Sequence, residues 1–418
     1  MEEWQRLLAE GINTPKRMVE EFPDLDIEMV KEINQDFHIR INKYFLEVAK
    51  KAGAPLLKQI VPDGRELKEG AGCCGDPLAE DSMSPVKNIV HRYPDRCLFL
   101  VSHQCSFYCR YCTRKRKVSD PEQISRAQID PGIEYIRSHP EIRDVILSGG
   151  DPLMLKDEEL EPIVKAVREI PHVEIIRIGT RMPGALPQRI TPKLVAWLKK
   201  YHPIYMMVHF NHPAEVTPEA KAALELLADN GFPTMNQAVL LKGVNDDPAV
   251  MMDLNQALLR ARCRPYYLYQ TDVTKGTNHF RTTTRKALAV IRGLRGWTSG
   301  LAVPHLVIDA PGGGGKIPIL PRYQVRKTDQ EVVMRNYKGD LYRYPEVPEE
   351  ELCAPDPGYR TKDDAPAAPV IVPVSAVKLL GTNGTNGAAL HGSNGNGKHG
   401  GNGAAHHGSN GTTVKARV

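Results

Sequence analysis

The sequence lacks long hydrophobic runs, a strong excess of charge and a secretion signal, and each absence excludes a class of protein. No run of about 18 apolar residues occurs in the 418 residues, which excludes a typical membrane-spanning helix. The formal net charge is +5, too small over this length to indicate a nucleic-acid surface. The first residues, Met-Glu-Glu-Trp-Gln-Arg, lack the basic-then-apolar pattern of a signal peptide. We therefore expect a cytoplasmic protein whose eight cysteines stay reduced.

The apolar share of 41% is that of a globular enzyme, and its pattern predicts an α/β fold. From about residue 97, short apolar segments alternate with helical ones, which is typical of βαβ units around a parallel sheet. The predicted strands are 97–102, 144–147, 173–178, 205–209, 233–240 and 266–269. The predicted helices between them are 133–138, 158–169, 192–201, 218–230 and 249–261. Six strands with their helices indicate a partial (β/α)6 barrel, in which the loops after the strands gather at one face.

The chain divides into four expected regions. Residues 1–90 form an N-terminal helical region, in which apolar spacing predicts one amphipathic helix over 33–48. Residues 91–310 form the partial barrel, and residues 311–345 hold a glycine–lysine loop and a C-terminal segment. Residues 346–418 form a linker and a low-complexity tail. Because this tail is mostly Gly, Asn, His, Ser, Thr and Ala, we expect it to be disordered.

Three cysteines, Cys105, Cys109 and Cys112, form the most informative motif. They lie in one short loop after the apolar run 98–101, and thiolates are the soft ligands that hold iron–sulfur clusters. A structural zinc site usually has four protein ligands, a disulfide suits a secreted protein, and chance clustering of buried cysteines is the remaining alternative. Three ligands leave one iron of a four-iron cluster open to a small molecule. The Cys-x3-Cys-x2-Cys spacing resembles the signature of the radical S-adenosylmethionine (SAM) enzymes.

The second motif is the run Asp-Ala-Pro-Gly-Gly-Gly-Gly-Lys that ends at Lys316. Four consecutive glycines allow the backbone to approach a ligand closely and to point several N–H groups at it. The lysine that follows could bind a phosphate or form a Schiff base. The motif is not a P-loop, because Ile317 rather than Ser or Thr follows the lysine. A flexible hinge with a solvated lysine is the plain alternative.

Both motifs, with blocks between them, resemble the lysine 2,3-aminomutase family of radical SAM enzymes, which also carry pyridoxal 5′-phosphate (PLP). The resemblance runs from about residue 76 to residue 344, the greater part of the chain. The other matching blocks are 91–96 (His-Arg-Tyr-Pro-Asp-Arg), 147–152 (Leu-Ser-Gly-Gly-Asp-Pro), 186–191 (Leu-Pro-Gln-Arg-Ile-Thr), 209–213 (His-Phe-Asn-His-Pro), 243–246 (Gly-Val-Asn-Asp) and 279–282 (His-Phe-Arg-Thr). So many blocks in family order argue against a chance resemblance.

The resemblance implies cofactor roles for individual residues. It assigns the [4Fe–4S] cluster to Cys105, Cys109 and Cys112. It assigns the amino end of SAM to Ser148, Gly149, Gly150 and Asp151, which follow a predicted strand. It assigns PLP to Lys316, as the Schiff-base partner, and to Arg92, Tyr93, Arg96, Arg181 and Gln237. Arginine suits phosphate because its planar donors pair with phosphate oxygens, although a surface salt bridge is the ordinary reading of any one arginine.

The resemblance also implies the substrate. Arg114 matches the residue that pairs with the α-carboxylate, and Asp272 and Asp309 match the two carboxylates that receive the distal ammonium of lysine. A buried cation needs such partners, whereas the plain readings are a turn residue for Asp272 and a strand end for Asp309. The implied reaction interconverts L-lysine and L-β-lysine by SAM-derived radical chemistry on a PLP aldimine. Paired carboxylates also suit a guanidinium, so L-arginine or another amino acid stays open as the substrate.

Partners and departures complete the prediction. The resemblance implies an electron donor such as flavodoxin or ferredoxin and a homo-oligomer, with no nucleic acid and no membrane. The family's zinc site is not expected, because Asp247 replaces a cysteine and the C-terminal region keeps only Cys353. Gln270 and Lys275 flank Asp272 in a loop that differs from lysine-specific relatives. A non-mutase binding or regulatory protein would not need both cofactor sets, and a hydrolytic or transferase PLP enzyme would not need the three cysteines.

Overall fold

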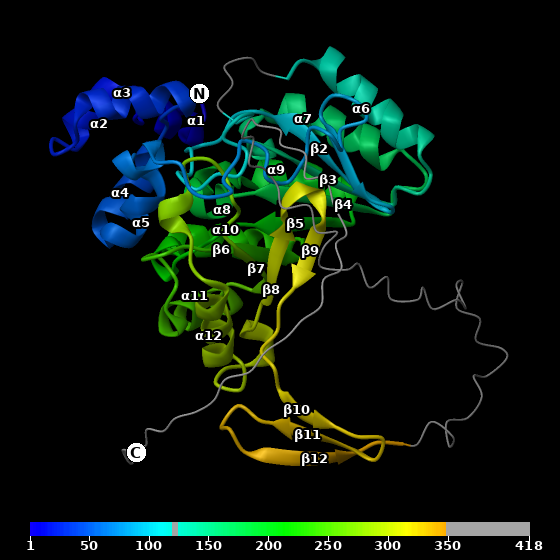
Figure 1. Cartoon of the computed structure of the whole chain (residues 1–418). Coiled ribbons are helices and arrows are strands. Elements are labelled where there is room, and N and C mark those ends of the chain that lie inside the picture. The colour runs from blue at the N-terminus through cyan, green and yellow to red at the C-terminus, as the bar shows by residue number, and fades with distance from the viewer. Residues whose placement is uncertain (119–123, 348–418) are drawn as a thin grey trace, which may run out of the picture. The chain divides into compact units, whose positions relative to one another are not determined.

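The computed structural model describes residues 1–118 and 124–347. Five short helices come first: α1 (Glu3–Ala9), α2 (Pro15–Glu21), α3 (Ile27–Asp36), α4 (Lys43–Ala52) and α5 (Ala54–Ile60). They form the group drawn in blue in Figure 1. Their apolar sides pack around a small core of their own, which includes the buried side chains of Val30, Ile41 and Phe45. The predicted N-terminal helical extension is therefore present.

The single helix predicted over residues 33–48 is wrong, because two helices with a break between them occupy this stretch. α3 ends before the break and α4 begins after it. Within the break, Ile41 is buried and pairs with Ile12 through two backbone hydrogen bonds of 2.8 Å. Asn42 then accepts a hydrogen bond from the backbone of Phe45 and caps α4. The apolar spacing continues across the break, so periodicity alone could not locate it.

A nine-stranded sheet forms the centre of the fold, with its strands in chain order from β1 to β9. Its parallel strands are β2 (Arg96–Ser102), β3 (Asp144–Gly149), β4 (Ile175–Thr180), β5 (Ile204–Val208), β6 (Thr234–Leu240), β7 (Cys263–Gln270) and β8 (His305–Ala310). The antiparallel edges are β1 (Ile89–Tyr93) and β9 (Gly315–Pro318). All six predicted strands are present, which confirms the partial barrel. The sheet adds β8 and the two antiparallel edges to them.

Helices cover this sheet. They are α6 (Arg126–Ser138), α7 (Asp157–Arg168), α8 (Met182–Ala185), α9 (Pro192–Leu198), α10 (Pro218–Asp229), α11 (Pro248–Arg260) and α12 (Thr284–Leu294). Figure 1 shows α6 and α7 beside β2 to β4, and α11 and α12 beside β7 and β8. Strand residues such as Leu147, Ile178 and Leu240 are fully buried, because a parallel sheet is covered on both faces. The apolar strand segments of the sequence therefore build the core.

After β9 the chain forms a second, three-stranded antiparallel sheet. Its strands are β10 (Gln324–Lys327), β11 (Glu331–Arg335) and β12 (Leu341–Pro345). Several of its apolar side chains are more than half exposed, among them Leu341, Tyr342 and Tyr344. The predicted linker and disordered tail, 346–418, lies outside the described residues except for its first two positions. The other region boundaries stay predictions.

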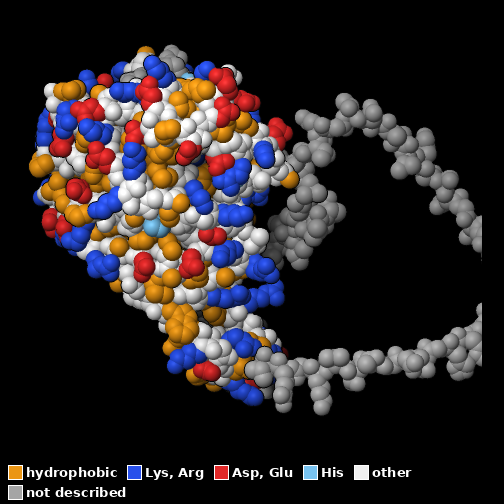
Figure 2. Space-filling model, turned by 90° about the vertical axis from the view of Figure 1, so that its left-hand side faces the viewer, with side chains coloured by type: hydrophobic (Ala, Val, Ile, Leu, Met, Phe, Trp, Pro, Cys, Tyr) orange, Lys and Arg blue, Asp and Glu red, His pale blue; other side chains and the backbone are white. Residues whose placement is uncertain are grey.

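The charge on the surface and the length of the helices are relevant to binding of nucleic acid and of a membrane. On the face drawn in Figure 2, basic and acidic side chains are interspersed, with apolar ones between them. This mixture matches the small net charge of the chain, and that face presents no field of a single sign. None of the helices in the described part of the chain is long and apolar enough to cross a membrane.

Candidate active site

The predicted site residues lie at the ends of neighbouring strands of the barrel. The cysteine loop follows β2, Ser148 and Gly149 end β3, and the loops after β3, β4 and β7 carry Gly150 and Asp151, Arg181 and Asp272. Gln237 lies in β6, Asp309 in β8 and Lys316 in β9. Because the carboxyl ends of parallel strands meet at one edge of a barrel, this arrangement collects residues that are far apart in the sequence.

The three cysteines of the loop after β2 are unpaired and partly buried. Burial raises the pKa of Cys105 well above its usual value, and the charges of Asp151 and of the neighbouring thiols add to the rise. Burial, followed by repulsion from Cys109, raises the pKa of Cys112 to about 11. The thiolate forms of these cysteines repel one another, and a bound metal cation would stabilise them. They fit an iron–sulfur cluster, although no three His, Cys, Asp or Glu side chains are arranged as metal ligands within residues 1–118 and 124–347.

Arg181, predicted to contact PLP, lies at the cysteine loop. Its Nη1 donates to Cys109 Sγ at 2.9 Å and also to the hydroxyl of Tyr111. Its Nη2 donates to Glu215 at 2.9 Å and to Gln59 at 2.8 Å. Glu215 is fully buried, and a buried carboxylate draws the nearest cation to itself. The structure therefore pairs Arg181 with the cysteine loop and with Glu215, and its contact with PLP stays a prediction.

The loop after β3, expected to receive SAM against exposed backbone, uses its N–H groups inside the protein. The N–H of Gly150 donates to the carbonyl of Ser102 at 2.6 Å, and that of Asp151 donates to Gln104 at 2.7 Å. Gly149 has φ +124°, and a Cβ there would lie 2.1 Å from the Ser102 oxygen. The glycines are thus required for contact with the cysteine loop. Because the N–H groups of Gly150 and Asp151 are already used, the loop after β3 would bind the amino group of SAM, which is a donor, through its oxygen acceptors.

Asp151 is a buried carboxylate that joins two site loops. It accepts hydrogen bonds from the hydroxyl of Thr180 at 2.8 Å and from the backbone of Leu153 and Arg181 at 3.0 and 2.7 Å. Burial raises its pKa above the usual value. These contacts fix the loops after β3 and β4 against each other, and a contact of Asp151 with SAM stays a prediction.

Lys316 lies directly opposite Asp309, because β9 runs antiparallel to β8. Its Nζ is 3.0 Å from Asp309 Oδ2, and its side chain is 28% exposed, so the amine is accessible. The ring centre of Tyr269 lies 5.6 Å from Nζ. Arg92 also contacts Asp309, with Nη1 2.9 Å from Oδ1. An accessible amine beside an aromatic ring and an arginine fits PLP, which requires an amine for its Schiff base and a cation for its phosphate.

Three further residues predicted for PLP lie around Lys316. The hydroxyl of Tyr93 accepts a hydrogen bond from the backbone of Lys316 at 2.9 Å, which connects β1 with β9. The guanidinium of Arg96 lies over the ring of Tyr93, 3.9 Å from its centre. Gln237 accepts a hydrogen bond from the hydroxyl of Tyr269 at 3.0 Å. The structure therefore brings these residues into the surroundings of Lys316.

The charge of one predicted carboxylate, Asp309, acts on the other, Asp272, across the site. Burial, followed by repulsion from Asp309, raises the pKa of Asp272 to about 6. The charges of Lys316 and Arg114 and a hydrogen bond of 3.0 Å from Thr113 oppose this rise. Asp272 is thus half-buried among charged groups of both signs, which is the environment that a cationic ligand can stabilise.

Arg114, the predicted partner of the substrate α-carboxylate, already binds Glu80 through one edge of its guanidinium group. Its Nε donates to Glu80 at 2.9 and 3.1 Å, and its Nη2 is 2.8 Å from Glu80 Oε1. Its Nη1 donates to the hydroxyl of Ser148 at 3.4 Å. The side chain of Ser148 thus contacts Arg114, and a contact of Ser148 with SAM stays a prediction. Glu80, Thr113, Tyr269 and Glu215 are site residues that the sequence analysis did not find.

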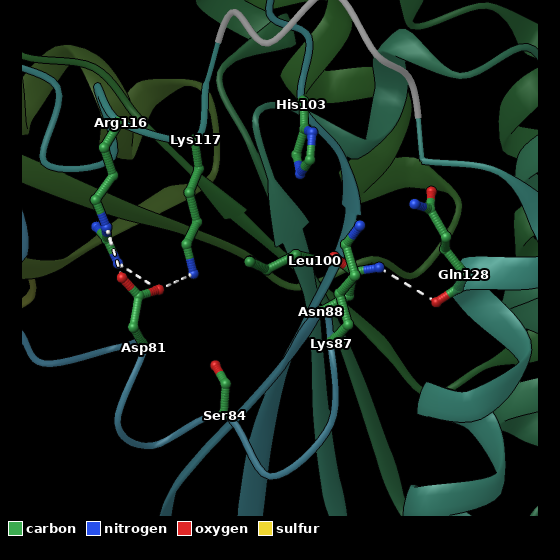
Figure 3. Close-up of a pocket in the computed structure, with 9 residues that line it drawn as sticks. All are labelled: Asp81, Ser84, Lys87, Asn88, Leu100, His103, Arg116, Lys117 and Gln128. Carbon is green, nitrogen blue, oxygen red and sulfur yellow. Dashed lines mark hydrogen bonds and ion pairs between the residues drawn. The ribbon is translucent and has the colours of Figure 1, made fainter.

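A cavity of about 300 Å³ lies outside this group of residues. Figure 3 shows Arg116 and Lys117 turned toward Asp81 at one side of it. It is lined by Asp81, Ser84, Lys87, Asn88, Leu100, His103, Arg116, Lys117 and Gln128. None of the predicted site residues lines this cavity.

A partial barrel of parallel strands, with three cysteines in the loop after the first of them, defines a radical SAM protein. The model of the Radical SAM superfamily matches residues 99–254, and a model described as Lysine-2,3-aminomutase matches residues 291–368. Aminomutases are isomerases, and membership of the superfamily implies SAM, a [4Fe–4S] cluster and a small-molecule substrate.

Curated relatives specify the family. The L-lysine 2,3-aminomutase of Acetoanaerobium sticklandii is 48% identical over 347 residues, which cover 82% of this chain and 84% of that protein. That of Fusobacterium nucleatum is 53% identical over 293 residues, 70% of this chain and 69% of that protein. The glutamate 2,3-aminomutase of Clostridioides difficile is 43% identical over 324 residues, 77% and 76% of the two chains. The chain belongs to the lysine 2,3-aminomutase family, and the resemblance seen in its motifs is confirmed.

Proposed function

We propose that this protein is an L-lysine 2,3-aminomutase that interconverts L-lysine and L-β-lysine. The observation that carries the proposal is the pair of carboxylates, Asp272 and Asp309, beside Lys316. The contact of Lys316 Nζ with Asp309 is itself a primary ammonium on a carboxylate, the interaction that the distal end of lysine requires. A glutamate side chain would bring a third carboxylate into this space, which its charges disfavour.

Arg114 binds the opposite end of the substrate, its α-carboxylate. An arginine can bind two carboxylates at once, one on its side edge and one on its outer edge. Glu80 takes the side edge, which leaves the outer edge for the α-carboxylate of an amino acid. A cation at one end of the site and two acids at the other match a zwitterion that carries a second ammonium group.

We further propose that the cysteine loop holds the [4Fe–4S] cluster with SAM, and that Lys316 holds PLP with Arg92, Tyr93, Arg96 and Gln237 around it. When bound, these groups supply the radical and the imine on which the 2,3-amino shift depends. The protein's own residues bind both ends of the substrate, fix its orientation and keep water from the reacting carbon atoms.

The remaining partners follow from the same chemistry. We propose that a small one-electron carrier, such as flavodoxin or ferredoxin, reduces the cluster, and that the protein works in the reducing cytoplasm. The exposed apolar side chains of β10 to β12, among them Tyr342 and Tyr344, support a homo-oligomer.

The test is anaerobic incubation of the reconstituted protein with SAM, PLP, a reductant and one amino acid at a time. Lysine should give its β-isomer, detected by NMR or mass spectrometry, whereas glutamate should give none. The Cys109→Ala variant, which lacks one cluster ligand, is the matched control and should cleave no SAM. A protein that converts arginine and not lysine would refute the substrate assignment. Turnover by the Cys109→Ala variant would refute the cluster assignment.

A further inference from the structure

Glu80 is a buried carboxylate that no cofactor or substrate role explains. Only 3% of its side chain is exposed. It lies in an irregular segment, residues 75–88, which precedes β1 and contains no sequence motif for a ligand. Nε of Arg114 lies 2.9 and 3.1 Å from its two carboxylate oxygens, and Nη2 lies 2.8 Å from Oε1.

The segment that carries Glu80 is itself fixed to the Lys316 side of the site. Its backbone N–H donates to Asp76 Oδ1 at 3.1 Å, which closes a turn. The carbonyl of Pro77 accepts a hydrogen bond from Gly312 at 2.8 Å, and that of Leu78 accepts one from Arg92 at 2.7 Å. These contacts anchor Glu80 between the glycine loop and the cysteine loop.

The guanidinium of Arg114 is thereby held from two sides. Glu80 occupies the side edge formed by Nε and Nη2, and the hydroxyl of Ser148 meets Nη1 at 3.4 Å. Among the residues that the structure describes, no other side chain takes the outer edge, where one N–H of Nη1 and one of Nη2 point in parallel. That edge has the geometry that binds a second carboxylate in two hydrogen bonds.

The charge on Glu80 is maintained although it is buried. Burial alone would raise its pKa, but the guanidinium of Arg114 outweighs this and holds the pKa below the usual value. Arg116 contributes from 3.6 Å. Glu80 is therefore an anion at neutral pH, and a fixed anion orients a flexible arginine more firmly than a neutral group does.

We propose that Glu80 is a positioning residue, which holds the side edge of Arg114 so that its outer edge faces the α-carboxylate of the substrate. This inference rests on the proposed function, in which Arg114 binds that carboxylate. Glu80 does not touch the substrate, and it makes the site selective for ligands that carry a carboxylate next to the amine.

The test compares two ligands on the full-length protein loaded with PLP under anaerobic conditions. The ligands are L-lysine and 1,5-diaminopentane, which is lysine without its carboxylate, and calorimetry or cofactor absorbance gives each Kd. The variants are Glu80→Gln, which keeps the shape and removes the charge, and Glu80→Asp, which keeps the charge but moves it away from Arg114 because the side chain is shorter. Asp81→Asn is the matched control, since Asp81 is the next carboxylate of the segment and pairs with Arg116 and Lys117 (Figure 3).

Both Glu80 variants should raise the Kd of lysine, Glu80→Gln by about tenfold or more, and change that of the diamine by less than about twofold. The control should change neither Kd. Tighter lysine binding in Glu80→Gln would overturn the inference, since Glu80 would then compete with the substrate for Arg114. Equal weakening of both ligands would also overturn it, because Glu80 would be a general structural residue. A wild-type protein that does not favour lysine over the diamine would refute the role of Arg114 in the proposed function.

Discussion

Replacing Asp272 by asparagine should stabilise the cofactor-free protein and at the same time weaken its hold on lysine. Asp272 is half-buried, and its pKa is raised from an ordinary 3.8 to about 6 by burial and then by the charge of Asp309. Asparagine has the same shape, can still accept the hydrogen bond from Thr113, and carries no charge. The variant therefore removes an unfavourable charge without creating a cavity.

The size and sign of the effect follow from this pKa. A carboxyl with a raised pKa binds its proton more tightly in the folded state, so its ionisation lowers the free energy of unfolding as pH rises from about 4 to about 6. With ~1.4 kcal/mol for each pKa unit, ionised Asp272 destabilises the fold by ~3 kcal/mol at pH 8 and by roughly half as much at pH 5. Asp272→Asn should be more stable than the wild type by these amounts.

The assay is urea unfolding of the cofactor-free proteins at pH 5 and pH 8. Asp253→Asn is the control, because Asp253 is an exposed carboxylate on α11 and its loss should change stability little at either pH. The same Asp272 variant, reconstituted with its cofactors, should show a higher KM for lysine. Equal stabilities of Asp272→Asn and wild type at pH 8 would refute the reasoning, because the carboxyl would then not be destabilised in the fold.

Three further predictions use other parts of the site. Gly149→Ala should lower the free energy of unfolding by at least ~2 kcal/mol in urea, because its φ is +124° and its Cβ would meet a backbone oxygen; Gly75→Ala, in open space, should be near neutral. Lys316→Ala should lose bound PLP on gel filtration while keeping its iron, and retention of PLP would count against the assignment. Arg181→Met should lose ~3 to 5 kcal/mol of stability, since buried Glu215 would have no cation, and an unchanged urea midpoint would contradict this.

Short-range patterns predict much of this fold. The strands from β2 to β7 are apolar segments bounded by turns, and their alternation with helices is sufficient to indicate a parallel barrel. β1 is different, because His91, Arg92 and Tyr93 give it little apolar character and it is held by its pairing with β2. The break between α3 and α4 also depends on a distant partner, since Ile41 pairs with Ile12. Single-sequence periodicity contains no information on such pairings.

The residues of the site also divide into those that motifs predict and those that they do not. Lys316, Asp309 and Arg92 belong to motifs, and the structure brings them together as the motifs predict. The contacts of Arg181 at the cysteine loop could not be predicted, because they depend on buried Glu215, which is 34 residues away and lies in no motif of its own. Glu80 was missed for the same reason, since it meets Arg114 across 34 residues from an irregular segment.

The most direct test of the account follows a hydrogen from the lysine site to the cluster site. Lysine that carries deuterium at C3 is incubated with the anaerobic, reconstituted protein, and the recovered SAM is analysed by mass spectrometry. If the cysteine loop and the Asp272–Asp309–Lys316 site work on one substrate, deuterium should appear at the 5′ carbon of SAM, and β-lysine should form with it. Formation of β-lysine with no deuterium in SAM, or SAM cleavage that does not depend on lysine, would contradict the account.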